Sequence, residues 1–270
     1  MNADANFPEL LSRDALDEAE AAAISRVKAA PGDARARMVL ADLALLTGNL
    51  ERADLQLGFA ADLVPEEAVG IGLLRTQLRG IFAREKWFAE GAVPSFPKGP
   101  TPCDEAALRL GLALHAEDGA SASTALEALE EARGTRPGRW NGATVDDLRD
   151  LDDRFAHAME AVTSGGDYVW IDLAHVARVA FEPPRRMRDL AWRRARVTLT
   201  DGAGADLLVP ALYPCPTSPE ERLGRMTDWH EAPGGLRIGT GQRAFLAGDV
   251  MEGLMDATLI ELQHPDSADG

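Results

Sequence analysis

The feature that most constrains the fold of this chain is a change of residue pattern around residues 164–166. Before it, the chain is rich in Ala, Leu, Glu and Arg, and its apolar residues recur at helical spacing. After it, Val, Ile, Thr, Pro and aromatic residues become more frequent, and apolar residues alternate with polar ones as in strands. The pattern predicts an α+β protein, with an all-helical domain over residues 1–164 and a small, mainly antiparallel β-rich domain over residues 165–270.

An internal period marks the helical half. Pro31 and Pro65 stand 34 residues apart, which is the period of tetratricopeptide repeats, each a pair of antiparallel helices. Within residues 33–65, small residues and leucines follow the pattern of that repeat, and Gly48 supplies the break between the two helices. Only this unit is convincing, so an irregular helical bundle is the alternative to a short stack of repeats.

More helices complete the predicted first half. They are expected over residues 12–30, 66–87, 104–117, 121–133 and 145–162. Acidic residues crowd the last of these segments, but an EF-hand loop needs alternating oxygen ligands, a central glycine and a terminal glutamate. The acidic residues are therefore predicted to lie on a solvated helix face.

The second half is predicted to be a small, twisted sheet. Strands are expected over residues 168–171, 175–181, 196–200, 206–209, 243–246 and 257–262. The pair Asp201-Gly202 predicts a tight turn, so two of these strands form a hairpin. Antiparallel pairing is favoured because parallel strands need a long crossover connection, and the connections here are short.

The charge of the chain limits its partners. A formal net charge of −16 is the wrong sign for neutralising phosphate groups, so we expect no binding to nucleic acid or anionic membranes. Residues 1–13 lack the basic and apolar stretches of a secretory signal. The longest uncharged stretch, residues 207–219, is too short to span a bilayer. We therefore expect a cytoplasmic protein without membrane insertion.

Motifs that carry catalysis are absent from the sequence. It has no G-x-S-x-G, no P-loop and no catalytic Cys/His signature, and its five histidines show no metal-ligand spacing. Cys103 and Cys215 are far apart, which argues against a zinc site or a disulfide framework. The sequence predicts no catalytic residue, no metal and no cofactor.

One basic cluster stands out against the acidic background. Six arginines lie within residues 185–196, together with Asp189 and Trp192. Guanidinium groups bind carboxylates with paired hydrogen bonds and stack on aromatic rings. The cluster suits either an acidic partner segment or the chain's own helical half, and we favour the second because that half is so acidic.

A second dense patch, residues 223–230, is either a contact site or a loop anchored by a core tryptophan. The residues predicted to bind a partner are Arg185, Arg186, Arg188, Trp192, Asp228 and Trp229.

The rival hypothesis is an enzyme with an unrecognised site at Arg185, Arg188, Asp228 and His230. It requires these groups to converge in a concave pocket.

Several stretches of the sequence resemble a known family. Residues 181–192 read FEPPRRMRDLAW, residues 209–214 read VPALYP, and residues 241–243 read GQR. These stretches, and the helical first half, are similar to the ImpE/TagJ family, accessory proteins of bacterial type VI secretion systems. The resemblance covers nearly the whole chain.

The resemblance implies a cytoplasmic, non-enzymatic protein with a helical N-terminal domain and a β-containing C-terminal domain. It also implies contact with an N-terminal helix of the small subunit of the contractile sheath. Association with the AAA+ unfoldase that recycles contracted sheath is implied in the same way. Binding of a helix in a groove needs no catalytic residue, which agrees with the missing motifs. A tetratricopeptide-type scaffold for another assembly is the remaining alternative, and it differs only in its partner.

Overall fold

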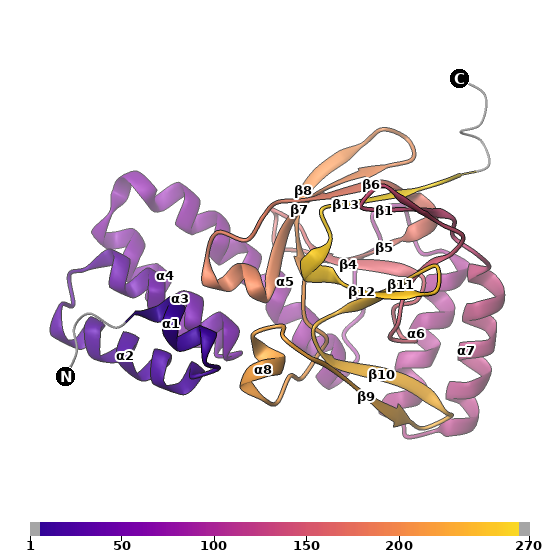
Figure 1. The fold of residues 1–270 in the computed structure, drawn as a ribbon, viewed down its shortest axis with the longest axis horizontal. Helices are drawn as coiled ribbons and strands as arrows, with labels where there is room; N and C mark the ends of the chain where they lie inside the picture. The colour runs from indigo at the N-terminus through magenta and orange to yellow at the C-terminus, as the bar shows by residue number, and fades with distance from the viewer. Residues whose placement is uncertain (1–5, 265–270) are drawn as a thin grey trace.

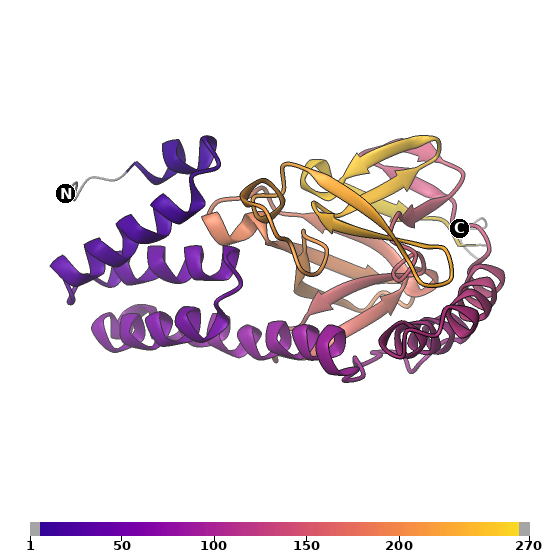
Figure 2. The ribbon, with the colours of Figure 1, turned by 90° about the horizontal axis from the view of Figure 1, so that it is seen from below.

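The computed structural model describes residues 6–264. Its helices are α1 (Phe7–Ser12), α2 (Leu16–Ala29), α3 (Ala34–Leu46), α4 (Leu50–Leu63), α5 (Ala68–Glu90), α6 (Pro102–His115), α7 (Gly119–Arg133) and α8 (Pro219–Arg222). Helices α1 to α4 form one end of the molecule, and α6 and α7 lie at the opposite end, with the sheets between them (Figure 1). Figure 2 shows the long helix α5 running from the N-terminal helices to the sheets.

Helices α3 and α4 confirm the two helices expected within residues 33–65. Asp33 caps α3 by accepting a hydrogen bond from the Ala36 N–H at 3.1 Å. Asn49 caps α4 in the same way. Gly48, which lies between the helices, has a φ of 77°, a left-handed conformation that glycine adopts without steric cost. Of these features, Gly48 is the break that the sequence predicted between the two helices. The assignment of the helices to the tetratricopeptide class stays a prediction.

The described strands form three antiparallel sheets. They are β1 (Gly138–Trp140), β2 (Ala143–Val145), β3 (Leu148–Asp150), β4 (Ala158–Val162), β5 (Tyr168–Asp172), β6 (Val176–Phe181), β7 (Trp192–Leu199), β8 (Gly204–Pro210), β9 (Thr227–Ala232), β10 (Leu236–Gly241), β11 (Ala244–Ala247), β12 (Val250–Gly253) and β13 (Leu259–Leu262). An eight-stranded sheet has the order β2-β1-β13-β6-β7-β8-β4-β5, and the smaller sheets have the orders β12-β11-β3 and β10-β9. The predicted hairpin is confirmed as β7 and β8, in which Arg196 pairs with Asp206.

The helix predicted over residues 145–162 is wrong. The chain there forms β3, an irregular segment, and β4, all five residues of which are buried. A strand that is buried on both faces carries a short continuous apolar run, which periodicity alone does not distinguish from a helix. The expected solvated face is also wrong, since Asp150 and Asp152 are fully buried. Strands therefore begin before residue 164, while the division into domains at residue 165 stays a prediction.

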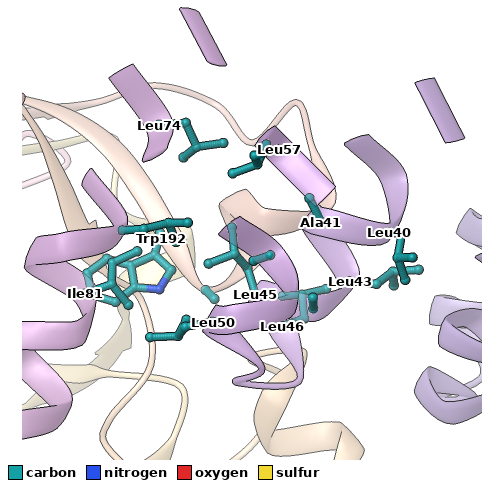
Figure 3. Packing of buried hydrophobic residues seen from close by; sticks show 14 of the residues in the cluster. Leu40, Ala41, Leu43, Leu45, Leu46, Leu50, Leu57, Leu74, Ile81 and Trp192 are labelled. Carbon is teal, nitrogen blue, oxygen red and sulfur yellow. The ribbon is translucent and has the colours of Figure 1, made fainter. Parts of the chain in front are cut away.

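Buried apolar side chains tie the helices to the sheets. One cluster contains residues of α1 to α5 together with residues of β4, β7 and β8. Figure 3 shows Trp192 of β7 beside Ile81 of α5, with Leu45 and Leu50 nearby. A second cluster of buried apolar residues joins the eight-stranded and three-stranded sheets. A third cluster packs α6 and α7 against Trp87 of α5 and Trp170 of β5, whose rings contact each other edge-on. Among residues 6–264, no helix is both long enough and apolar enough to cross a membrane.

Candidate protein-binding site

A cleft of about 410 Å³ opens where the N-terminal helices meet the eight-stranded sheet. Its walls come from the junction of α3 and α4, the last turns of α5, the start of β7 and the loop that follows β8. We call it the seam cleft. Apolar side chains make up most of its lining, among them Leu46, Leu50, Ile81, Phe88, Trp192 and Leu212.

Hydrogen bonds hold the walls of the seam cleft in place. The Tyr213 N–H, in the loop after β8, donates to the Gly241 carbonyl at 2.8 Å. Across the cleft, the Arg222 guanidinium of α8 donates to the Thr47 carbonyl at 2.9 Å. This second bond connects the C-terminal half to the turn between α3 and α4. Contacts within this chain therefore hold the cleft in shape without a partner.

Two neighbouring charged residues of α5 line the seam cleft. Arg84 is buried and donates two hydrogen bonds to Glu160, at 2.9 and 3.2 Å, and one to the Leu212 carbonyl at 3.2 Å. Glu85 is exposed to solvent. Partial dehydration at the cleft wall raises the pKa of Glu85, and the nearby charge of Glu51 adds to the rise. The cleft thus presents one accessible acidic group beside its apolar walls.

A buried charge network lies behind Arg84. Glu160 of β4 is fully buried and accepts hydrogen bonds from Arg84, from Arg243 and from the Tyr168 hydroxyl. Burial alone would raise the pKa of Glu160, but the two guanidinium groups outweigh this effect and lower it to about 2. Glu160 is therefore ionised at neutral pH, and it pairs with two buried arginines.

Asp150 of β3 extends this network. Its Oδ1 accepts a hydrogen bond from the Tyr213 hydroxyl at 2.6 Å, and its Oδ2 lies 3.5 Å from Nε of Arg243. Burial raises the pKa of Asp150 to about 7, and the charge of Arg243 opposes the rise. Asp150, Glu160 and Arg243 are all fully buried, so they support the cleft wall from behind and leave Arg84 as the charged member of the network that lines the cleft.

The structure divides the predicted arginine cluster. Arg188 is buried and forms an ion pair of 2.6 Å with Asp42 of α3, the contact with the helical half that the sequence favoured. Arg193 is buried and donates to backbone carbonyls. Arg185 and Arg186 are exposed. Partner binding by the exposed pair stays a prediction.

The other predicted residues lie apart from one another. Trp192 lines the seam cleft, whereas Asp228 is exposed on β9 and lies outside the cleft lining. Trp229 is half-buried and packs on Tyr213, with 5.7 Å between the ring centroids. Arg185 and Arg188 line a separate cavity, and neither Asp228 nor His230 is among its lining residues. That cavity does not gather the four groups of the rival enzyme site.

Sequence reasoning missed the buried network and the cleft. The available signal was the glutamate within the otherwise apolar run Ala-Met-Glu-Ala-Val of β4, since a buried carboxylate needs cationic partners. Its partners come from α5 and from the loop before β11, 76 and 83 residues away in the chain. In the part of the chain that the structure describes, no group of three or more His, Cys, Asp or Glu side chains is arranged to hold a metal ion.

Three comparisons with known proteins agree with this architecture. A family model described as ImpE protein matches residues 142–261. The type VI secretion system accessory component TagJ of Pseudomonas aeruginosa is 30% identical over an alignment of 266 positions that covers 96% of this chain and 92% of that protein. A crystal structure of a Vibrio parahaemolyticus protein has a TM-score of 0.89 and 26% identity, over 96% of this chain and 98% of that one. The predicted α+β fold is confirmed.

Proposed function

The chain belongs to the ImpE/TagJ family, and from this premise and the seam cleft we propose that it is a non-enzymatic adaptor of a type VI secretion system. Its partner in this proposal is the N-terminal helix of the small subunit of the contractile sheath. Through this contact it links the sheath to the AAA+ unfoldase that recycles contracted sheath. Its place of action is the cytoplasm.

The observation that carries the proposal is the apolar lining of the seam cleft. An amphipathic helix binds by placing apolar residues, spaced three and four apart, into a groove. The cleft offers Leu50 from α4, Ile81 and Phe88 from α5, and Trp192 from β7 as contacts for such residues. A volume of about 410 Å³ falls within the range of about 300–1,000 Å³ typical of ligand pockets. The cleft therefore suits a few anchoring side chains of a helix.

Charge adds a requirement on the partner. Glu85 lines the cleft, Glu51 lies near it, and the chain as a whole carries a net charge of −16. A helix with basic residues beside its apolar face is complementary to this surface, and long-range attraction would speed its association. Arg84 and Arg222, the cations at the cleft, are already bonded to Glu160 and to the Thr47 carbonyl. Because both cations are engaged in holding the cleft walls, the cleft is better suited to binding than to catalysis.

Titration of the full chain with a labelled peptide tests the proposal. The peptide is the N-terminal segment of the cognate small sheath subunit, and fluorescence anisotropy measures its binding. We expect a dissociation constant in the micromolar range. Ala89 is exposed at the cleft on α5, so Ala89→Arg fills the cleft without removing a core side chain. This variant should weaken binding at least about tenfold, equivalent to about 1.4 kcal/mol.

A matched control lies on the same helix. Val69 is 87% exposed near the start of α5 and does not line the cleft. It is an exposed apolar residue of the helical half, as Leu55 and Phe59 of α4 are. Val69→Arg should leave the affinity unchanged. Loss of binding in Val69→Arg but not in Ala89→Arg would place the binding site near the start of α5 and contradict the cleft. Absence of binding by the unaltered chain would contradict the adaptor function.

A further inference from the structure

A second cavity, of about 190 Å³, lies in the segment that connects β6 to β7. We call it the arginine cavity, and it shares no lining residue with the seam cleft. Its charged lining residues are Arg185, Arg186, Arg188, Arg193, Arg194, Glu182 and Asp189. Five guanidinium groups thus face two carboxylates in a chain whose overall charge is strongly negative.

The backbone of the arginine cavity is held by its own side chains. Oδ2 of Asp189 accepts the N–H groups of Arg185 and Arg186, at 2.8 and 2.9 Å. This bonding satisfies part of the Asp189 carboxylate and fixes the turn that carries the two arginines. The Arg193 guanidinium donates to the Glu182 carbonyl at 2.9 Å and so holds the opposite end of the segment. The cavity is therefore formed before any partner binds.

The positive charge inside the cavity is incompletely neutralised. Arg193 is only 2% exposed, and its hydrogen bonds go to backbone carbonyls rather than to a carboxylate. Its Nε is buried and has no hydrogen-bond partner in residues 6–264. Burial lowers the pKa of Arg193, and Asp256 and Asp189 oppose this effect. No carboxylate is hydrogen-bonded to Arg193, so its positive charge would attract an anion in the cavity.

The remaining guanidinium groups are on the rim. Arg185, Arg186 and Arg194 are exposed, and none of them forms an ion pair with a residue that the structure describes. The inner groups, Arg188 and Arg193, are already bonded to Asp42 and to carbonyls. An extended ligand with several carboxylates offers a separate carboxylate to each rim group, which a single small anion does not.

We propose that the arginine cavity binds an acidic peptide segment of a protein partner, whose neighbouring Asp or Glu side chains pair with Arg185, Arg186 and Arg194. Arginine is suited to this role because its planar fork binds a carboxylate with two parallel hydrogen bonds. The excess negative charge elsewhere on the chain repels such a segment, so binding is confined to this surface. This inference goes beyond the adaptor function and does not require a helix in the seam cleft.

The test uses the full chain and a fluorescein-labelled hexaglutamate peptide, with a hexaglutamine peptide as the uncharged control. We expect the first to bind and the second not to bind in anisotropy titrations at low salt. Raising the salt concentration from 50 to 200 mM should weaken binding several-fold, because exposed charges are screened over about 10 Å. The triple variant Arg185→Ala, Arg186→Ala, Arg194→Ala should weaken binding at least about tenfold.

A second triple variant matches this change of net charge. Arg35, Arg79 and Arg178 are exposed on α3, α5 and β6, outside the arginine cavity. Changing all three to Ala should reduce the affinity less than twofold, and circular dichroism checks that both variants are folded. Equal losses in the two triple variants would overturn the proposal by showing that only net charge matters.

Two further measurements complete the test. Displacement of the peptide by inorganic phosphate at equal concentration would overturn the acidic segment in favour of a small oxyanion site. The cavity variant is also titrated with the sheath peptide. Retained sheath binding, together with lost hexaglutamate binding, supports two separate surfaces. Failure of sheath binding in the unaltered chain would contradict the adaptor function and leave the result for the arginine cavity intact.

Discussion

At the residue scale, Glu160 shows how burial changes the meaning of a charged side chain. It lies within an apolar strand and pairs with Arg84 from α5 and Arg243 from the loop before β11. A buried ion pair is not by itself strongly stabilising, because desolvation offsets much of the attraction. Removing one charge from such a network is nevertheless costly, since the charges that remain are buried without compensation.

We therefore expect Glu160→Gln to lower the free energy of unfolding by about 3–5 kcal/mol in urea titrations at pH 7. Glu231→Gln, at an exposed position on β9, serves as the control and should change it by less than about 0.5 kcal/mol. The lowered pKa also predicts a pH dependence. The contribution of the ionised Glu160 to the free energy of unfolding is present above pH 4.5 and is lost as the pH falls towards 2. The Glu160→Gln variant should not show this decrease in stability at low pH. An unchanged stability in Glu160→Gln would contradict the role of the network.

At the scale of the element, helix α5 connects the helical end to the sheets because its backbone packs closely on strand β4. A Cβ on Gly80 would lie 2.5 Å from Cγ1 of Val162 and 3.0 Å from the Gly166 carbonyl oxygen. The glycine therefore allows the helix backbone to contact β4 and the turn that follows it. Gly72, two turns earlier on the same helix, has no heavy atom within 4 Å of the corresponding position.

The two glycines give a matched pair of substitutions. Gly80→Ala should destabilise the protein by about 1–3 kcal/mol, because Val162 and the turn must move to admit a methyl group. Gly72→Ala should stabilise it by about 0.5–1 kcal/mol through helix propensity alone. Chemical denaturation of both variants measures the difference, and stabilisation by Gly80→Ala would show that α5 does not pack closely on β4.

At the scale of the whole molecule, the helical and sheet regions are joined by more than apolar contact. Trp192 and Leu208 belong to the same buried cluster as the leucines of α3 and α4. Beside them, the buried pair of Asp42 and Arg188 crosses the same boundary. Burial raises the pKa of Asp42, and Arg188 opposes the rise, so the carboxylate depends on its partner to remain charged.

A double-mutant cycle measures this connection. Arg188→Met and Asp42→Leu should each cost about 3–5 kcal/mol, and the double variant should cost much less than their sum. The exposed pair of Arg196 and Asp206, within the β7–β8 hairpin, is the control and should show a coupling below about 1 kcal/mol. Urea unfolding of the full chain gives all the values. Additive costs for the buried pair would mean that it does not connect the two regions.

Much of the fold was determined by the sequence on its own, because its signals act over a few residues. The spacing of small residues and leucines within residues 33–65, the break at Gly48 and the turn at residues 201–202 are local features, and they placed α3, α4 and the β7–β8 hairpin. The stretches that resemble the ImpE/TagJ family could likewise be found by reading the chain.

Only the tertiary structure decided the rest, because it depends on which distant segments meet. Residues 158–162 form a strand rather than a helix since β5 and β8 pair with them on both sides. Glu160 is buried and ionised because Arg84 and Arg243 arrive from elsewhere in the chain. The seam cleft likewise combines walls from residues 45–50, 81–89, 191–192 and 210–222. Local propensity carries no information about contacts between distant segments, because these contacts follow from the burial of apolar surface across the whole chain.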